Sequence, residues 1–234
     1  MILELGWRTI RQVDLRLLGK FAFTFGWKGL GAVRQFQKRL ARGEHFPAFL
    51  FMSITNRCNL RCQGCWVSQT TPPADLSLED MNRIVDTGRK HGCSFYGLLG
   101  GEPLLHPQWA EFVAAHPDCY FQVFTNGTPL TDDVAKEMNR LGNVTPLISV
   151  EGNPEVSDVR RDGTGVYDKS MAAVENARRH GLITGVSCSI CQSNIADLAT
   201  EEFAQALIER GVTYLWYYIY RPVGPQPTPE LALS

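Results

Sequence analysis

Residues 49–66 read FLFMSITNRCNLRCQGCW, an apolar run that leads directly into three closely spaced cysteines. Residues 49–55 have the length and the composition of a buried β-strand. Cys58, Cys62 and Cys65 follow in a Cys-x3-Cys-x2-Cys pattern, in a polar segment typical of a loop. Ligands of parallel sheets bind beyond the carboxyl ends of the strands. This order therefore predicts that the loop after the first strand carries the chemistry.

Apolar runs and amphipathic stretches alternate from this point to residue 220. The predicted strands are residues 49–55, 95–100, 120–125, 146–150, 185–190 and 214–220. The predicted helices between them are residues 78–91, 109–115, 132–141, 169–180 and 200–210. Such repeats form parallel sheets through right-handed crossovers. The fold class is therefore α/β, and periodicity alone does not choose between an open doubly wound sheet and a curved barrel.

Three thiolates this close in sequence can converge on one soft metal centre. A structural zinc ion usually takes four protein ligands, and the nearest further candidates, His91 and Cys93, lie beyond the next predicted helix. A [4Fe-4S] cluster held by three cysteines leaves one iron open to a small molecule, and an open position implies catalysis. Two alternatives stay open at this point: a zinc loop completed by a distant residue, and three unrelated structural thiols.

Further motifs follow the later strands. The second strand runs into Gly100-Gly101-Glu102-Pro103, the third ends at Thr125-Asn126-Gly127, and the fourth ends at Ser149-Val150-Glu151-Gly152. Together with the cysteine pattern, these motifs resemble the radical S-adenosylmethionine (radical SAM) enzymes over roughly residues 46–222. The resemblance implies a partial (β/α)6 TIM-like barrel of the radical SAM type, preceded here by an N-terminal helical extension.

Two cofactors are implied by this resemblance, a [4Fe-4S] cluster and S-adenosylmethionine. It implies that Cys58, Cys62 and Cys65 bind the cluster. It places S-adenosylmethionine at Gly100, Gly101, Glu102, Pro103, Asn126, Ser149, Glu151 and Ser187. The residue before the last cysteine is commonly aromatic in this family, whereas this chain has Gly64, so no residue is assigned to the adenine ring.

The reaction implied by the resemblance is the reductive cleavage of S-adenosylmethionine to methionine and a 5′-deoxyadenosyl radical, which abstracts hydrogen from a substrate. An electron donor such as flavodoxin or ferredoxin is the implied partner. The cofactors supply this reactivity, so no catalytic side chain is assigned. The substrate is not identified, and peptide or protein maturation and a lipid-like substrate both stay open. The alternative function is a non-catalytic iron-sulfur or zinc-binding electron carrier or scaffold.

Composition excludes several other classes of protein. The chain has 234 residues, 44% hydrophobic and 20% charged, which is too apolar for a disordered protein. It contains no run of about 18 apolar residues, and charged residues from Arg8 to Arg16 interrupt any signal-peptide core. Seven cysteines, an odd number, favour reduced thiols over a secreted disulfide framework. We therefore expect a cytoplasmic location.

The first 45 residues form a basic leader. Residues 7–42 contain nine Lys or Arg side chains and one acid, Asp14, and they include Trp7 and Trp27. One interpretation is a helical extension that packs on the core. The other is peripheral contact of residues 1–42 with an anionic membrane surface. No nucleic acid partner is expected.

The rest of the chain divides into a core of residues 46–222 and a Pro-rich tail of residues 223–234. The resembled enzymes that modify peptides commonly continue into an extension with auxiliary clusters. We expect truncation before such an extension, because an exposed aromatic strand edge favours association, and a minimal core that acts with a partner is the alternative. On the last predicted strand, alternate residues face the barrel interior. Either Trp216 and Tyr218 or Tyr217 and Ile219 therefore border the cofactor or substrate.

Three weaker signals receive structural interpretations. Arg160 and Arg161 are expected in a surface loop, with an arginine that holds a carboxylate of the substrate or cofactor as the alternative. Cys188 and Cys191 are expected to be small buried residues, because residues three apart on a strand point to opposite faces. His106 is expected to cap the next helix.

Overall fold

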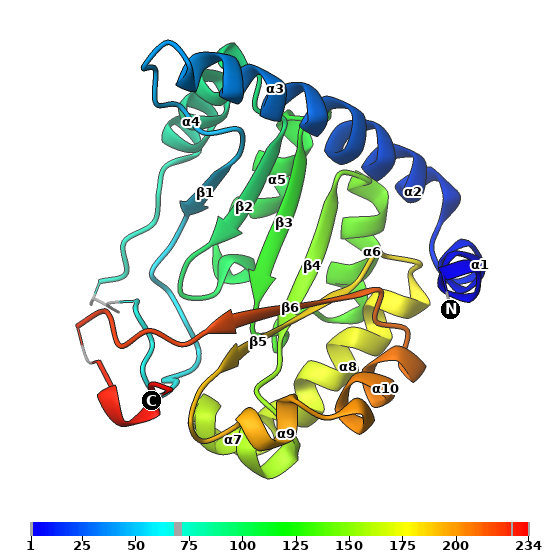
Figure 1. Cartoon of the computed structure of the whole chain (residues 1–234), viewed down its shortest axis with the longest axis vertical. Coiled ribbons are helices and arrows are strands. Elements are labelled where there is room, and N and C mark those ends of the chain that lie inside the picture. Colours follow the sequence, from blue (N-terminus) through cyan, green and yellow to red (C-terminus); the bar gives the residue numbers. More distant parts are fainter. Residues whose placement is uncertain (1, 68–71, 226, 234) are drawn as a thin grey trace.

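The computed structural model describes residues 2–67, 72–225 and 227–233. Six parallel strands form one sheet in the order β1-β2-β3-β4-β5-β6, so consecutive strands are neighbours. This sheet curls into a half-barrel (Figure 1). The predicted α/β class and partial barrel are confirmed. The strands are β1 (Leu50–Ser53), β2 (Phe95–Leu99), β3 (Tyr120–Thr125), β4 (Val144–Ser149), β5 (Gly185–Ile190) and β6 (Tyr214–Ile219).

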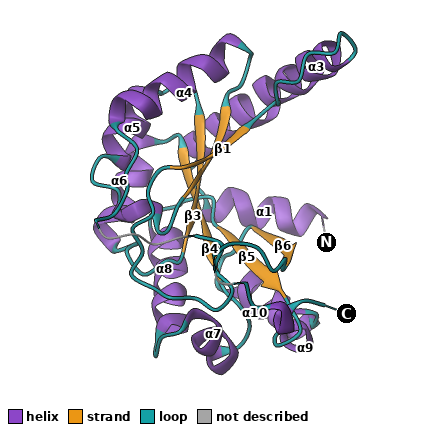
Figure 2. Cartoon of the chain, turned by 90° about the vertical axis from the view of Figure 1, so that its left-hand side faces the viewer, coloured by secondary structure: helices purple, strands orange, loops and turns teal. Residues whose placement is uncertain are grey.

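Helices cover the outer face of the sheet (Figure 2). Two of them begin with a side-chain cap. The Ser77 side chain accepts a hydrogen bond from Asp80 N, and the Thr131 side chain accepts one from Val134 N. Gly142 ends one helix with a φ of 77°, a conformation that favours glycine. The predicted helices are α4 (Leu78–Lys90), α5 (Trp109–Ala115), α6 (Asp132–Leu141), α8 (Val166–Arg179) and α10 (Glu201–Glu209).

Two helices were not predicted. The expectation of a surface loop around Arg160 was wrong, because α7 (Pro154–Arg161) follows β4. The side chain of Asn153 accepts a hydrogen bond from Val156 N at 3.0 Å, and Pro154 occupies the first turn, where its missing N–H costs nothing. The other elements are the short helix α9 (Ile195–Leu198) and the 3-10 turns η2 (Pro103–Leu105) and η3 (Pro229–Leu231).

The hydrophobic core lies between the sheet and its helices. Alternate residues of β2 and β3, such as Tyr96 and Phe121, are fully buried there with Val85 of α4 and Phe112 of α5. Burial of this apolar surface is the main favourable contribution to folding. Cys93, Cys119, Cys188 and Cys191 are also buried, as predicted for structural thiols.

The leader consists of α1 (Ile2–Gln12), α2 (Leu15–Phe21), the π-helical turn η1 (Ala22–Lys28) and α3 (Gly29–Leu40). It lies across the amino ends of the central strands (Figure 1). Lys28 Nζ donates to Asp118 O at 2.9 Å, and Ser94 Oγ donates to Thr24 O at 3.2 Å. The leader therefore packs on the core, at the end of the barrel opposite the carboxyl ends of the strands.

After β6 the tail turns back toward the loop that follows β1 (Figure 1). Leu231 is buried with Cys191 and Tyr220, and Leu231 O accepts a hydrogen bond from Gln192 N at 2.9 Å. Within the ranges that the structure describes, no helix combines the length and the apolar character needed to cross a bilayer.

Candidate functional site

The cysteine loop, residues 56–66, connects β1 to the segment before α4 and is held from two sides. On one side, Gly101 N donates to Thr55 O at 2.8 Å and Glu102 N donates to Arg57 O at 2.6 Å. On the other side, Gln63 N donates to Arg160 O at 3.0 Å. The turn after β2 and the end of α7 therefore fix the backbone that carries the three cysteines.

Gly100 and Gly101 are needed for this contact. A Cβ atom on Gly100 would lie 2.5 Å from Thr55 O, and one on Gly101 would overlap Arg57 O. In the structure these glycines allow the turn and the backbone of the cysteine loop to approach closely. Pro103, the next residue but one, is buried at the start of η2.

Glu102 is fully buried and accepts three hydrogen bonds. Its Oε1 accepts from Leu104 N at 3.1 Å and from Thr125 Oγ1 at 2.8 Å, and its Oε2 accepts from Asn126 N at 2.7 Å. Burial raises the pKa of this carboxyl to about 7, although the three donors oppose the shift. The Glu102 side chain thus joins the turns after β2 and β3.

Asn126 lies beside the first cysteine. Its Nδ2 donates to Asn59 Oδ1 at 2.9 Å and lies 3.9 Å from Cys58 Sγ. Leu60 N also donates to Cys58 Sγ, at 3.4 Å. Donors directed at a sulfur stabilise its thiolate form, which is the form that binds metal.

Glu151 forms the second half of the site, after β4. Its Oε1 lies 2.6 Å from Arg161 Nη2, and its Oε2 accepts from Ser189 N at 3.1 Å. Ser149 Oγ and Ser187 Oγ lie 3.3 Å apart on the neighbouring strands. The structure therefore brings together the residues predicted on β4 and β5.

Arg161 connects this half of the site to the cysteine loop, a contact that the sequence did not predict. Its Nη1 lies 3.8 Å from Cys62 Sγ. Burial alone would lower the pKa of this guanidinium, but the charges of Glu151 and Cys62 raise it above its usual value. Its Nε is buried and has no hydrogen-bond partner among the described residues. The polar start of α7 at Asn153 and Pro154 is the signal that could have placed this arginine.

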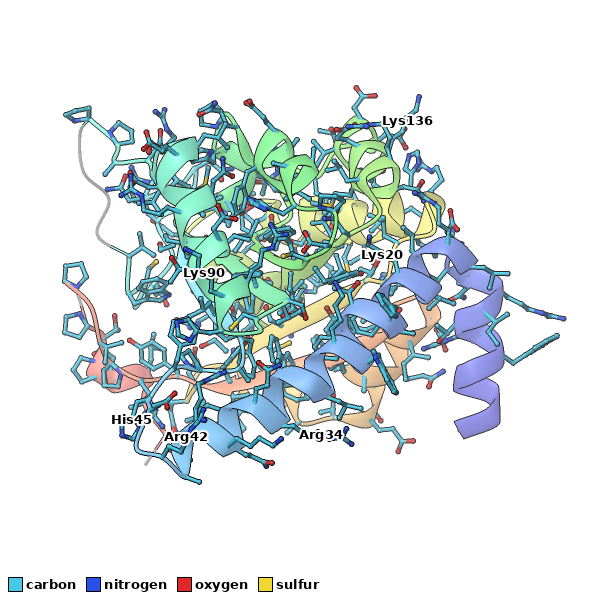
Figure 3. The ribbon with its side chains drawn as sticks, turned by 90° about the horizontal axis from the view of Figure 1, so that it is seen from above. Lys20, Arg34, Arg42, His45, Lys90 and Lys136 are labelled. Atoms are coloured by element: carbon cyan, nitrogen blue, oxygen red, sulfur yellow. The ribbon has the colours of Figure 1, made fainter. Side chains whose placement is uncertain are left out.

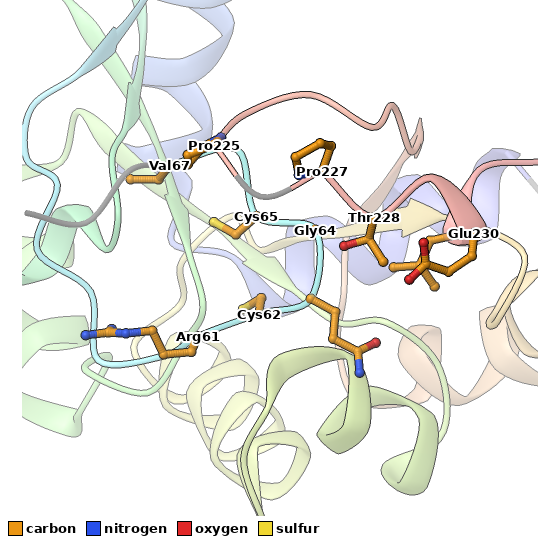
Figure 4. A pocket seen from close by; sticks show the side chains of 11 residues that line it. Arg61, Cys62, Gly64, Cys65, Val67, Pro225, Pro227, Thr228 and Glu230 are labelled. Carbon is orange, nitrogen blue, oxygen red and sulfur yellow. The ribbon is translucent and has the colours of Figure 1, made fainter.

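A cavity of about 660 Å³ adjoins the cysteine loop on the side of the tail (Figure 4). Cys62, Gly64 and Cys65 line one wall, and Thr228 and Glu230 line another. Gly64 has a φ of 66°, and a Cβ atom there would overlap the ring of Tyr220. The aromatic side chain expected just before the last cysteine is thus replaced by a ring that comes from the end of β6.

The donor set fits an iron-sulfur cluster with one open position. Burial raises the pKa of Cys58 and Cys65, so their ionisation depends on the metal and on nearby donors. Among the described residues, no group of three or more His, Cys, Asp or Glu side chains is close enough to share one metal ion. The cysteines of a [4Fe-4S] cluster each bind a different iron, so they do not share an ion. Arg161 supplies a positive charge and a free donor beside the same loop.

Comparisons with known proteins agree with this geometry. The family model described as the Radical SAM superfamily matches residues 52–204, more than half of the chain. The mycofactocin maturase MftC of Mycobacterium tuberculosis (strain ATCC 25618 / H37Rv) is 31% identical over 183 residues, which cover 75% of this chain and 46% of that protein. The AdoMet-dependent heme synthase of Methanosarcina barkeri is 26% identical over 76% of this chain and 52% of that protein. The chain spans about half the length of these curated relatives.

Solved structures share the fold. SuiB of Streptococcus suis superposes with a TM-score of 0.70 and 15% identity, over 85% of this chain and 46% of that chain. The structure of anSMEcpe with bound AdoMet superposes with a TM-score of 0.60 and 18% identity, over 74% of this chain and 52% of that chain. The likeness covers the curled six-stranded sheet, at whose carboxyl end the cysteine loop lies.

Proposed function

This chain belongs to the radical SAM superfamily, and we propose that it is the core of an enzyme that cleaves S-adenosylmethionine reductively and abstracts hydrogen from a substrate. Membership implies a [4Fe-4S] cluster and S-adenosylmethionine as cofactors. The observation that carries the proposal is the cysteine loop, which is held between the turn after β2 and the end of α7. When bound, these cofactors supply an electron and a 5′-deoxyadenosyl radical.

The residues of this chain bind and orient the two cofactors. Cys58, Cys62 and Cys65 hold three irons, and the backbone of Gly100 and Gly101 shapes the turn beside them. Pro103 fixes the start of η2 after that turn. Because the Glu102 carboxylate is occupied by donors of the protein, we assign the amino group of the cofactor to backbone carbonyls of this turn.

The polar groups after β4 and β5 complete the proposed cofactor site. Ser149, Ser187 and Glu151 face it from one side, and Asn126 faces it from beside Cys58. Arg161 has a buried Nε without a hydrogen-bond partner among the described residues, and its Nη1 lies near Cys62 Sγ, so we assign Arg161 to the carboxylate of the bound cofactor. None of these residues needs to act as an acid or a base in this scheme.

The names of the relatives point to more than one class of substrate. The relatives include maturases, one of them the sporulation killing factor maturation protein SkfB of Bacillus subtilis, and also a heme synthase. SuiB has been solved with its precursor peptide. These names span peptides and tetrapyrroles, so they do not choose one class for this chain. A small electron carrier such as flavodoxin or ferredoxin is the proposed reductant.

The proposal is tested with the anaerobically reconstituted protein. Given dithionite and S-adenosylmethionine, it should release 5′-deoxyadenosine, and Cys62→Ala should abolish the release because one iron loses its ligand. Cys119→Ala, a buried thiol far from the loop in sequence, is the matched control and should retain the activity. An iron-replete protein that releases no 5′-deoxyadenosine would favour the electron carrier or scaffold instead, and metal analysis would identify a zinc protein.

We also propose that the leader contacts an anionic membrane surface. Residues 15–43 contain seven Lys or Arg side chains and no Asp or Glu. Phe23, Trp27 and Leu30 are exposed and recur at helical spacing. Figure 3 shows Arg34 and Arg42 on the same leader, seen from above. Arg16, Lys20, Lys28 and Arg39 bond to the core, so Arg34, Lys38 and Arg42 are the leader cations left for this contact. Exposed aromatic side chains and cations are typical of helices that lie in a membrane interface.

Vesicle sedimentation tests the membrane contact. The full chain should bind vesicles that contain phosphatidylserine and should not bind pure phosphatidylcholine vesicles. Trp27→Ser should weaken the binding, whereas Trp109→Phe, in α5, should not. Substitution is preferable to deletion of the leader, because Thr24 and Lys28 bond to the core. Equal binding to both kinds of vesicle, or equal binding by the Trp27 variant, would remove the proposal.

A further inference from the structure

Aromatic rings line the inner face of the half-barrel below the cofactor-binding residues. Phe51 of β1 contacts Phe124 of β3, with ring centroids 5.7 Å apart, and Phe124 contacts Trp216 of β6 at 5.7 Å. Trp216 in turn lies 5.6 Å from Tyr218. These four rings, which we call the aromatic wall, connect the first and last strands across the concave side of the sheet. Of the two interpretations of β6, the one with Trp216 and Tyr218 inside is therefore confirmed.

The wall is open to solvent although it lies inside the curl of the sheet. Phe51 is 44% exposed, Trp216 is 36% exposed and Tyr218 is 40% exposed. On β1 and β3 the opposite face is buried under the helices, at Met52 and Phe121, whereas Tyr217 and Ile219 on the opposite face of β6 are exposed as well. Clustered aromatic side chains rarely stay exposed without a binding role.

A glycine makes room for the wall. A Cβ atom on Gly97 would overlap the Phe51 ring and would lie 3.2 Å from Phe124 Cε2. Gly185 makes room for Tyr214 in the same way, because the Tyr214 ring occupies the space that a Cβ atom on Gly185 would need. Tyr214 Oη accepts a hydrogen bond from Gln122 Nε2 at 2.7 Å, so its polar atom is satisfied within the sheet. The inner face is thus arranged to present rings.

The same face carries no charge. Side chains alternate along a strand, and register pairs place Phe51, Gly97 and Gln122 in one row and Ser187 and Trp216 in another. In all six strands, the residues that share this face with these positions are uncharged: none is Asp, Glu, Lys, Arg or His. The charged groups of the site, such as Arg161, lie in loops and helices beyond the carboxyl ends. An ionised substrate group on the wall would have no counter-charge there.

We propose that the aromatic wall binds the substrate, and that the part of the substrate held there is an uncharged hydrocarbon. This inference rests on the proposed function, because the wall and the cofactor site share one sheet. A carboxylate on the wall would lose its hydration without an ion pair, and a peptide backbone would lose water from its N–H and C=O groups. A hydrocarbon loses nothing by the same transfer and gains contact with the rings.

Binding can be measured without turnover. Tritiated farnesol, an uncharged isoprenoid alcohol, should bind the reconstituted full chain saturably at one site in equilibrium dialysis. Phe51→Glu should raise its dissociation constant by about tenfold or more, because it buries a charge against the ligand. Phe51→Leu should stay within about threefold of the wild type. Phe23→Glu, on the exposed side of the leader, should bind as the wild type does.

A second position protects the test against a folding defect. Phe51 and Tyr218 are both half-exposed, so a charge at either residue should be tolerated by the fold, and Tyr218→Glu should weaken farnesol binding in the same way. No saturable binding by the wild type, or unchanged binding by both Glu variants, would overturn the proposal. Displacement of farnesol by acetyl-Gly-Phe-Gly-amide but not by geraniol would also overturn it, in favour of a peptide.

The outcome is separable from that of the proposed function. Farnesol binding needs neither reductant nor S-adenosylmethionine. A protein that binds farnesol at the wall and releases no 5′-deoxyadenosine contradicts the proposed function alone. A protein that releases 5′-deoxyadenosine and does not bind farnesol contradicts the substrate class alone.

Discussion

Glu102 and Glu151 are buried carboxylates at the carboxyl ends of two strands, but their surroundings differ. Glu102 meets only neutral donors, two backbone N–H groups and the hydroxyl of Thr125. Glu151 forms an ion pair with Arg161 at 2.6 Å. Neutral donors satisfy hydrogen bonds without balancing the charge, so burial still raises the pKa of Glu102 to about 7.

The difference separates two roles within one set of motif residues. Glu102 braces the turns after β2 and β3 against each other, and its own oxygens are fully used in doing so. Glu151 fixes an arginine that reaches Cys62. Only the second carboxylate holds a cation next to the cysteine loop, and four substitutions or conditions test the distinction.

Removal of the cation should have the largest effect. Arg161→Met leaves the Glu151 carboxylate buried without its partner, which we expect to cost about 3–5 kcal/mol of unfolding free energy. Urea unfolding of the full chain at neutral pH measures this loss. Iron retention should also fall, because Arg161 lies 3.8 Å from Cys62 Sγ.

An exposed ion pair provides the control for this variant. Arg179 pairs with Asp132 at 2.7 Å, and both side chains are more than half exposed. Arg179→Met should therefore cost less than about 1 kcal/mol. If both variants lost the same unfolding free energy, the buried pair of Glu151 and Arg161 would contribute no more to stability than the exposed pair of Asp132 and Arg179.

The raised pKa of Glu102 should give the next largest effect, as a dependence of stability on pH. The pKa rises from 4.5 to about 7 on folding, so the folded protein keeps a proton that the unfolded chain releases. Below pH 4.5, the pKa in the unfolded chain, Glu102 is protonated in both states and the folded state pays no charge penalty. As the pH rises through the folded pKa, the buried carboxyl ionises and this contribution to the unfolding free energy is lost. Between pH 4.5 and about 7 the loss is on the order of 3 kcal/mol.

This dependence is measured as a difference. Unfolding free energies of the wild type and of Glu102→Gln, collected over that pH range, cancel the titration of all other groups. The difference should change across the range and become constant above the folded pKa. A difference that does not vary with pH would show that Glu102 titrates normally.

At pH 5, where the folded wild type keeps the proton on Glu102, Glu102→Gln should itself be destabilising by about 1–3 kcal/mol. An amide has one accepting oxygen, so its NH₂ group must face at least one of the donors of Leu104, Thr125 and Asn126. Glu79→Gln is the matched control, because the Glu79 side chain is 84% exposed, and it should change stability by less than about 0.5 kcal/mol. Thermal unfolding at pH 5 compares the two.

Much of this site could be predicted from the sequence because it depends on local patterns. Alternating strands and helices predicted the α/β class, and the resemblance of the motifs to the radical SAM family implied the half-barrel. The cysteines and glycines follow their strands directly in the chain. The roles of Glu102 and Arg161 could not be predicted in the same way. They depend on partners that lie far away in the sequence, and a motif does not state which of its side chains is already occupied.

The residue before the last cysteine shows the same limit. The sequence has Gly64 at a place where an aromatic side chain is common in this family. In the structure the ring of Tyr220, more than one hundred positions later, fills the space beside it. A packing contact between the cysteine loop and the end of β6 leaves no periodic signal in either segment.

The smallest effect should come from one donor of Glu102. Thr125→Val keeps the shape of the side chain and removes the hydroxyl that donates to Glu102 Oε1 at 2.8 Å. We expect a loss of about 1 kcal/mol, measured by urea unfolding. The hydroxyl favours the ionised carboxyl, so its removal should raise the pKa of Glu102 further, and the loss should be larger at pH 8 than at pH 5. Thr87→Val, which removes a donor to Arg83 O on the exposed side of α4, should show no such difference between the two pH values.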